Sequence, residues 1–134
     1  MARDNNQFLP YNITLDCSFA EFWRYNLIVH GEVSALGKSQ NIVKHVDEVA
    51  PVGTNLPAMP ATYHRPTTIS IETGAGDSLR LYIYLLPHTL PSVERIPDAE
   101  PFELVVTITQ GERLCYKHRY MINQWSGDNI EIFA

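Results

Sequence analysis

Five histidines and two cysteines are the side chains of this sequence best suited to metal binding or nucleophilic catalysis. None of them forms an H-x-H or H-E-x-x-H motif, and no cysteine lies at ligand spacing from a histidine. Two cysteines supply neither a disulfide framework nor a zinc motif. We therefore expect no metal and no cofactor. The residues concerned are His30, His45, His64, His88, His118, Cys17 and Cys115.

Cys115 is the candidate reactive thiol. Alternation along its strand places it on the outward face with Arg113, Lys117 and Arg119, and neighbouring cations favour a thiolate. The competing interpretation is structural: Glu103 on the preceding strand lies across from Arg119, and opposite charges across a strand pair are common. The structural interpretation is favoured. Cys17 lies among apolar residues, which indicates an unreactive buried thiol.

Recognisable enzyme motifs are absent from the sequence. The glycine-rich run at 74–78 connects two expected strands and does not open a helix, so it predicts a turn rather than a phosphate-binding loop. There is no G-x-S-x-G motif. An active site would need a cleft that brings together some of His64, Asp47, Glu48 and Cys115. We do not expect catalytic activity.

Tyrosine and arginine side chains suggest an interaction surface. Tyr82 and Tyr84 share the outward face of one expected strand with Arg80, and Tyr63-His64-Arg65 lies in a proline-rich loop. Tyrosine and arginine are enriched at protein interfaces. The candidate interaction patch is Tyr63, His64, Arg65, Arg80, Tyr82 and Tyr84. The equally weighted alternative is that the strand is central and covered on both sides.

Strict alternation of apolar and polar residues is the dominant pattern and predicts strands with one buried face. It runs over 11–19, 23–35, 67–86, 102–122 and 130–133. Several strands also place apolar or tyrosine side chains on the outer face, and these residues are Ile28, Tyr82, Tyr84, Leu86 and Val105.

Two of these segments are predicted to be hairpins. In 67–86, matching the faces sets Ile71 across from Leu79 with the loop Gly74-Ala75-Gly76. In 102–122, it sets Ile108 across from Leu114 with the loop 110–112, and His118 across from Leu104. A two-residue Gln-Gly turn would place Ile108 against an arginine, so that register is rejected.

The remaining segments are a short helix candidate and two loops. Ile42, Val46 and Val49 fall on one face of a helix over 41–49. Residues 18–21 have the pattern of a helix capping box. We expect at most one helical turn there, near Phe19–Phe22. Prolines mark long connections over 51–66 and 87–101.

Composition excludes several classes of protein. The chain has 134 residues, of which 45% are hydrophobic and 19% charged, which is typical of one folded domain. A net charge of -5 argues against nucleic-acid binding. No stretch approaches the ~20 apolar residues of a transmembrane helix. The polar N-terminus has no signal-peptide core, so we expect a cytoplasmic protein, with a removed signal as the alternative.

The sequence therefore predicts one all-β domain over 1–134. We expect an antiparallel β-sandwich of about seven strands with at most one short helix; a small β-barrel is the alternative. The expected function is a non-catalytic protein-interaction or assembly module that binds a protein partner or itself. The second hypothesis is a small-molecule or lipid-binding sandwich or barrel, with 51–66 as a lid and with a cavity lined by Tyr11, Trp23, Tyr25, Tyr116 and Tyr120.

Overall fold

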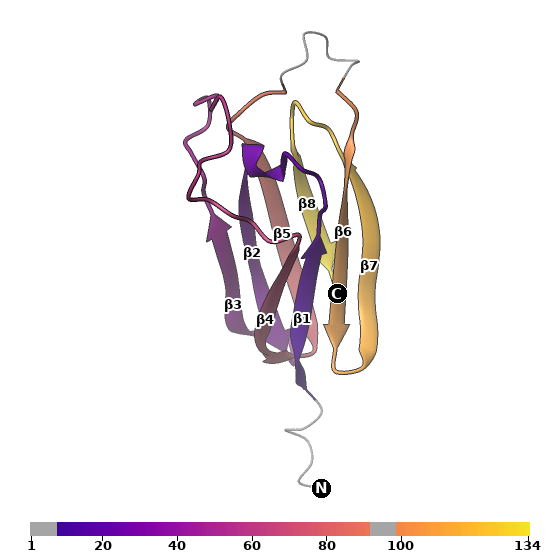
Figure 1. The fold of residues 1–134 in the computed structure, drawn as a ribbon. Helices are drawn as coiled ribbons and strands as arrows, with labels where there is room; N and C mark the ends of the chain where they lie inside the picture. The colour runs from indigo at the N-terminus through magenta and orange to yellow at the C-terminus, as the bar shows by residue number, and fades with distance from the viewer. Residues whose placement is uncertain (1–7, 92–98) are drawn as a thin grey trace, which may run out of the picture.

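The computed structural model describes residues 8–91 and 99–134. Within them the chain forms eight strands and one 3-10 helix. The strands build two antiparallel four-stranded sheets that pack face to face (Figure 1). The predicted β-sandwich is confirmed, and it is not closed into a barrel. The elements are β1 (Leu9–Asp16), the 3-10 helix (Phe22–Arg24), β2 (Tyr25–Ala35), β3 (Lys38–Asp47), β4 (Thr68–Gly76), β5 (Ser78–Pro87), β6 (Phe102–Gln110), β7 (Arg113–Ile122) and β8 (Asp128–Phe133).

The core lies between the two sheets. Sheet A has the strand order β4-β1-β6-β7, and sheet B has the order β3-β2-β5-β8. The alternation seen in the sequence places one apolar set of each central strand inward, as expected. Removal of these side chains from water is the main force that holds the sheets together. The fully buried residues include Ile13, Leu27, Val29, Val33, Leu81, Ile83, Leu85, Leu104, Val106 and Ile108.

The helix predicted over 41–49 is wrong, because this segment is mostly strand β3. A spacing of four residues places Ile42 and Val46 on one face of a helix, but it also places them on one face of a strand. In the structure both side chains lie on the outer face of sheet B, and Val43 between them is buried. The sandwich therefore has one strand more than expected.

The hairpin predicted over 67–86 is also wrong. β4 pairs with β1 in sheet A, where Ile71 lies opposite Ile13, and β5 pairs with β2 in sheet B. The chain crosses between the sheets at Asp77. The alternation correctly placed both strands' apolar faces inward, but it carries no information about which strand each one pairs with.

The glycine at the end of β4 allows close packing between the sheets. A Cβ atom built on Gly76 would lie 2.3 Å from Val33 Cγ1 and 2.6 Å from the carbonyl oxygen of Ser34. Gly76 was predicted to be the last residue of a tight turn. In the structure it marks a close approach between two backbone segments.

The hairpin predicted over 102–122 is present, but its register and loop differ from those expected. Ile108 lies opposite Tyr116, and the register shifts between Ile108 and Thr109. This β-bulge leaves a two-residue connection, in which Gly111 has φ +61°. A bulge reverses the alternation locally. As a result Leu114 is exposed and Cys115 packs against the core, which is the opposite of the predicted faces.

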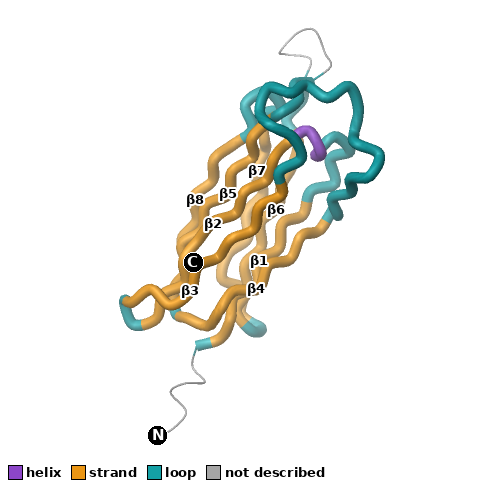
Figure 2. Tube along the Cα trace, turned by 90° about the vertical axis from the view of Figure 1, so that its left-hand side faces the viewer, coloured by secondary structure: helices purple, strands orange, loops and turns teal. Residues whose placement is uncertain are grey.

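Most of the longer connections gather at one end of the sandwich, here called the loop end (Figure 2). There the single helical turn spans Phe22–Arg24 rather than Phe19–Phe22, so the strand expected from Trp23 begins at Tyr25. The 51–66 connection crosses this end. Of the 87–101 connection, residues 92–98 lie outside the described part of the chain. A search of the described residues found no helix with the length and apolar character of a membrane span.

Candidate interaction surface

The outer face of sheet B carries an ordered array of side chains from all four strands. Pairing of β3, β2, β5 and β8 lines them up in three rows that cross the sheet. We call this array the sheet B face. Its rows are Val46-Ile28-Tyr84-Asn129, Lys44-His30-Tyr82-Glu131 and Ile42-Glu32-Arg80-Phe133.

The sheet B face exposes three large apolar side chains among polar ones. Ile42 is 64% exposed, Val46 50% and Phe133 62%. Ile28 and Tyr84 at the centre are half-buried. The solvent face of an antiparallel sheet is commonly polar, so exposed apolar side chains on both edge strands make this face a candidate interaction site.

The two tyrosines on the face lie side by side. The rings of Tyr82 and Tyr84 stack with centroids 6.5 Å apart and an angle of 8° between their planes. The guanidinium of Arg80 lies 5.3 Å from the centre of the Phe133 ring. Hydrogen bonding to the Glu131 carboxylate raises the pKa of the Tyr82 hydroxyl. The face thus presents flat aromatic surface.

The structure divides the candidate patch into two groups. Arg80, Tyr82 and Tyr84 lie together on the sheet B face. β5 is a central strand, as the alternative interpretation expected. Its two tyrosines are nevertheless only half-buried, so the described residues do not cover its outer side.

The other group, from the proline-rich loop, lies at the loop end and is anchored by Arg65. This side chain is 3% exposed. Its Nε donates to Asp47 Oδ2 at 2.8 Å, Nη1 to the Phe22 carbonyl at 2.8 Å, and Nη2 to the Tyr25 carbonyl at 2.8 Å. The Tyr63 hydroxyl donates to the same Asp47 oxygen at 2.7 Å. These groups tie the loop to the sheets, and only His64 of the tripeptide is exposed.

A second buried arginine also joins segments at the loop end. Arg24 is 2% exposed. Its Nη2 donates to Gln124 Oε1 at 2.5 Å, its Nη1 donates to the Thr89 carbonyl at 3.3 Å, and its Nε lies 2.9 Å from Glu21 Oε1. His88 is buried nearby, with Nε2 2.8 Å from the carbonyl oxygen of Trp23. These contacts account for the burial of two ionisable side chains.

A hollow of about 210 Å³ opens beside Arg65. Its lining includes Cys17, Phe19, Trp23 and Met59. This volume lies below the ~300–1,000 Å³ typical of small-molecule sites. The three nitrogens of the Arg65 guanidinium already donate to the chain itself, and the other polar side chains in the lining are Ser18, Tyr63, His64 and Thr67.

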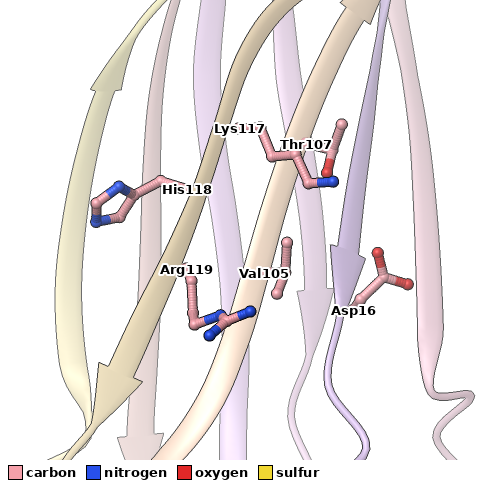
Figure 3. A pocket seen from close by; sticks show the side chains of 6 residues that line it. All are labelled: Asp16, Val105, Thr107, Lys117, His118 and Arg119. Carbon is pink, nitrogen blue, oxygen red and sulfur yellow. The ribbon is translucent and has the colours of Figure 1, made fainter.

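A larger hollow of about 610 Å³ lies on the outer face of sheet A (Figure 3). Figure 3 shows Lys117 and Arg119 on one side of β7, whereas His118 extends from the other side. The Arg119 guanidinium Nε lies 2.8 Å from Glu103 Oε2, and Asp16 Oδ1 accepts a hydrogen bond of 2.7 Å from the Thr68 hydroxyl. The pairing of Glu103 with Arg119 was predicted, but the contact is diagonal, since Glu103 lies opposite Met121. Of the two cations in the lining, Arg119 is thus paired with an acidic side chain of the chain itself.

The four residues considered for an active site do not all share a cleft. Asp47 ends β3 at the loop end, whereas Cys115 follows the tight β6–β7 turn at the opposite end (Figure 1). Both cysteines are free thiols. Burial raises the pKa of Cys17 to about 11, in keeping with the predicted buried thiol. In residues 8–91 and 99–134, no three His, Cys, Asp or Glu side chains cluster as metal ligands would.

Sequence reasoning did not find half of the sheet B face. Lys44, Ile42 and Val46 were assigned to a helix, and Glu131 and Phe133 were not considered because the last strand was placed without a partner. The missing signal was the even spacing of Ile42, Lys44 and Val46, which fits an edge strand. Comparison with known proteins found no matching family model and no significantly similar curated protein or solved structure.

Proposed function

We propose that this protein is a non-catalytic interaction module that binds a protein partner through the sheet B face. The observation that carries the proposal is the set of exposed apolar residues on that face, Ile42, Val46 and Phe133, around two half-buried tyrosines. Aromatic centres with mixed rims are typical of protein interfaces. If this face only met water, polar residues would be expected at these three positions.

The small-molecule hypothesis has less support. Of the aromatics expected to line a cavity, Tyr11 and Tyr25 are packed in the core, being 1% and 0% exposed. The expected lid is hydrogen-bonded to the neighbouring connection: Asn55 donates its backbone N–H to the His88 carbonyl at 2.8 Å, and the Leu56 N–H donates to Thr89 Oγ1 at 2.9 Å. These contacts favour a fixed cap on a solid core over a movable lid.

The test places a photoactivatable cross-linker on each face of the sandwich. We would incorporate p-benzoylphenylalanine in place of Tyr84 on the sheet B face, and separately in place of Thr107 on the outer face of sheet A. Both proteins would be irradiated in the cells that naturally produce the chain. We expect discrete protein adducts from position 84 and none from position 107, with Phe133→Ser in the same chain reducing the yield at position 84.

Absence of adducts at position 84, or adducts at position 107 alone, would overturn this function. Adduct formation at position 84 that Phe133→Ser leaves unchanged would also count against it, because Phe133 lies on the same face, two rows from Tyr84.

A further inference from the structure

Charged side chains on the sheet B face follow an antisymmetric pattern. In one row, Lys44 lies on edge strand β3 and Glu131 on the opposite edge strand β8. In the next row, Glu32 lies on central strand β2 and Arg80 on central strand β5. Each charge on one side of the midline between β2 and β5 is therefore matched by the opposite charge at the same height on the other side.

A face with this pattern is complementary to itself under one symmetry operation. A two-fold axis parallel to the strands, lying above the midline between β2 and β5, exchanges the left and right halves of the sheet. It turns a second copy to face the first, so that β3 of one copy lies over β8 of its partner and β2 lies over β5. Heights along the strands are preserved, so each row meets the same row of the other copy.

We propose that the partner of the sheet B face is a second copy of this chain, related by that two-fold axis; the inference rests on the proposed function of the face. Lys44 then lies over the partner copy's acidic residue at 131, and Glu32 lies over its basic residue at 80. Ile28 meets the second tyrosine of β5, and Ile42 meets the phenylalanine at 133. Every contact occurs twice, as in an isologous dimer.

The other face-to-face arrangement lacks this complementarity. A two-fold axis that lies in the interface and runs perpendicular to the strands would place each strand over its own copy. Lys44 would then meet only β3 residues of the partner and never Glu131. Since like charges and unpaired charges disfavour an interface, the charge pattern selects the parallel axis.

The dimer is expected to be weak and reversible. Four strands about 4.8 Å apart and about six residues long cover roughly 20 Å by 20 Å, less than the ~800 Å² per partner of a standard interface. Face-to-face sheets pack ~10 Å apart, with their strands at an angle of about 30°. The side chains of Lys44 and Glu131, at the edges of the face, are long enough to meet across this distance. We expect a dissociation constant in the micromolar range.

Sedimentation velocity between about 5 and 500 µM tests the proposal through charge reversal. Lys44 and Glu131 are three strand spacings apart in one chain, about 14 Å, so neither reversal acts on the other residue. Each reversal does place like charges diagonally within the sheet, K44E beside Glu32 and E131K beside Arg80, so the restoration by the mixture is the decisive result. We expect K44E alone and E131K alone to weaken dimerisation at least tenfold. An equimolar mixture of the two must restore it, because the heterodimer pairs acidic with basic side chains at both contacts.

E72K and K117E are the matched controls. Both positions are exposed and lie on the two edge strands of sheet A, and both variants should dimerise like the wild-type protein. Circular dichroism would confirm that all four variants remain folded. A loss of dimerisation in either control would overturn the assignment to sheet B, as would a mixture of K44E and E131K that stays monomeric.

A wild-type chain that stays monomeric at 500 µM would overturn the second copy as partner. In that case cross-linking from position 84 would still test the proposed function. A partner other than a second copy would give adducts whose mass is not twice that of the chain. If cross-linking from position 84 also failed, both the interaction face and the dimer would be excluded.

Discussion

Arg65 is the side chain that most closely links the loop end to both the core and the sheet. It donates hydrogen bonds to one carboxylate and two backbone carbonyls, and its guanidinium lies 4.7 Å from the centre of the Phe22 ring. Each acceptor is bound by a different nitrogen of the planar guanidinium. The single ammonium nitrogen of a lysine cannot occupy three such positions.

We therefore expect Arg65→Lys to lower the free energy of unfolding by about 3 kcal/mol, because it leaves the buried carbonyls of Phe22 and Tyr25 without their donor. Urea denaturation followed by circular dichroism would measure the change. Arg80→Lys, at an exposed position, is the control and should stay within about 0.5 kcal/mol of the wild-type protein. Equal effects at the two positions would contradict the structural role of Arg65.

Asp47 makes the same network sensitive to pH. Partial burial alone would raise the pKa of its carboxyl group, but hydrogen bonds from Tyr63 and Arg65 outweigh burial and lower it. A lowered pKa in the folded state stabilises the fold above the unfolded-state pKa of about 3.9, and this contribution is lost as the pH falls through the folded-state pKa.

We predict that Asp47→Asn lowers the free energy of unfolding by about 2 kcal/mol at pH 7, and that this difference shrinks as the pH falls below about 4. Urea denaturation at pH 7 and at pH 3 would measure both. Glu72→Gln, on the exposed side of β4, should show a small difference that does not depend on pH. An Asp47→Asn effect of the same size at pH 3 would show that the carboxylate charge contributes nothing.

Neither arginine network could be deduced from the sequence. Alternation identifies which side chains of a strand point inward, but Arg65 lies in a loop, where no periodicity applies. Its acceptors come from residues 18 to 43 positions away. A buried arginine can be recognised only from the tertiary structure, which shows the acceptors of its N–H groups.

At the scale of the elements, local pattern predicted the strands better than it predicted their partners. The inward faces of β1, β2, β5 and β6 follow directly from period-two alternation. Two predictions failed because different structures share one pattern: a four-residue spacing fits helix and strand alike, and strand–glycine–strand fits both a hairpin and a crossing between sheets. The β6–β7 register failed because a single-residue bulge leaves no mark in the apolar pattern.

The crossing between β4 and β5 depends on a residue without a side chain. A methyl group on Gly76 would overlap Val33 and the backbone of Ser34 in the facing sheet. We expect Gly76→Ala to lower the free energy of unfolding by about 2 kcal/mol, and the melting temperature by roughly 8 °C. Ser70→Ala on the exposed face of β4 should change little. A Gly76→Ala protein as stable as the wild type would show that the sheets can separate at this corner without cost.

At the scale of the whole molecule, the chain path binds the two sheets into one unit. Among the described strands, only β2–β3 and β6–β7 are consecutive neighbours within a sheet; every other connection passes from one sheet to the other. Both sheets also bury their inner faces only against each other, in one shared core. Neither sheet can therefore lose its structure while the other keeps its own.

This arrangement predicts a single cooperative unfolding transition. Ile83 in sheet B and Ile108 in sheet A are both 0% exposed, so Ile83→Ala and Ile108→Ala should each cost about 3–4 kcal/mol. Native-state hydrogen exchange would follow the slowest amides of β1 and β6 separately from those of β2 and β5. Each substitution should lower the free energy of exchange by the same amount in both sheets. If the amides of the unsubstituted sheet kept their protection, that sheet would have to be stable by itself, and the sandwich would be two folding units rather than one.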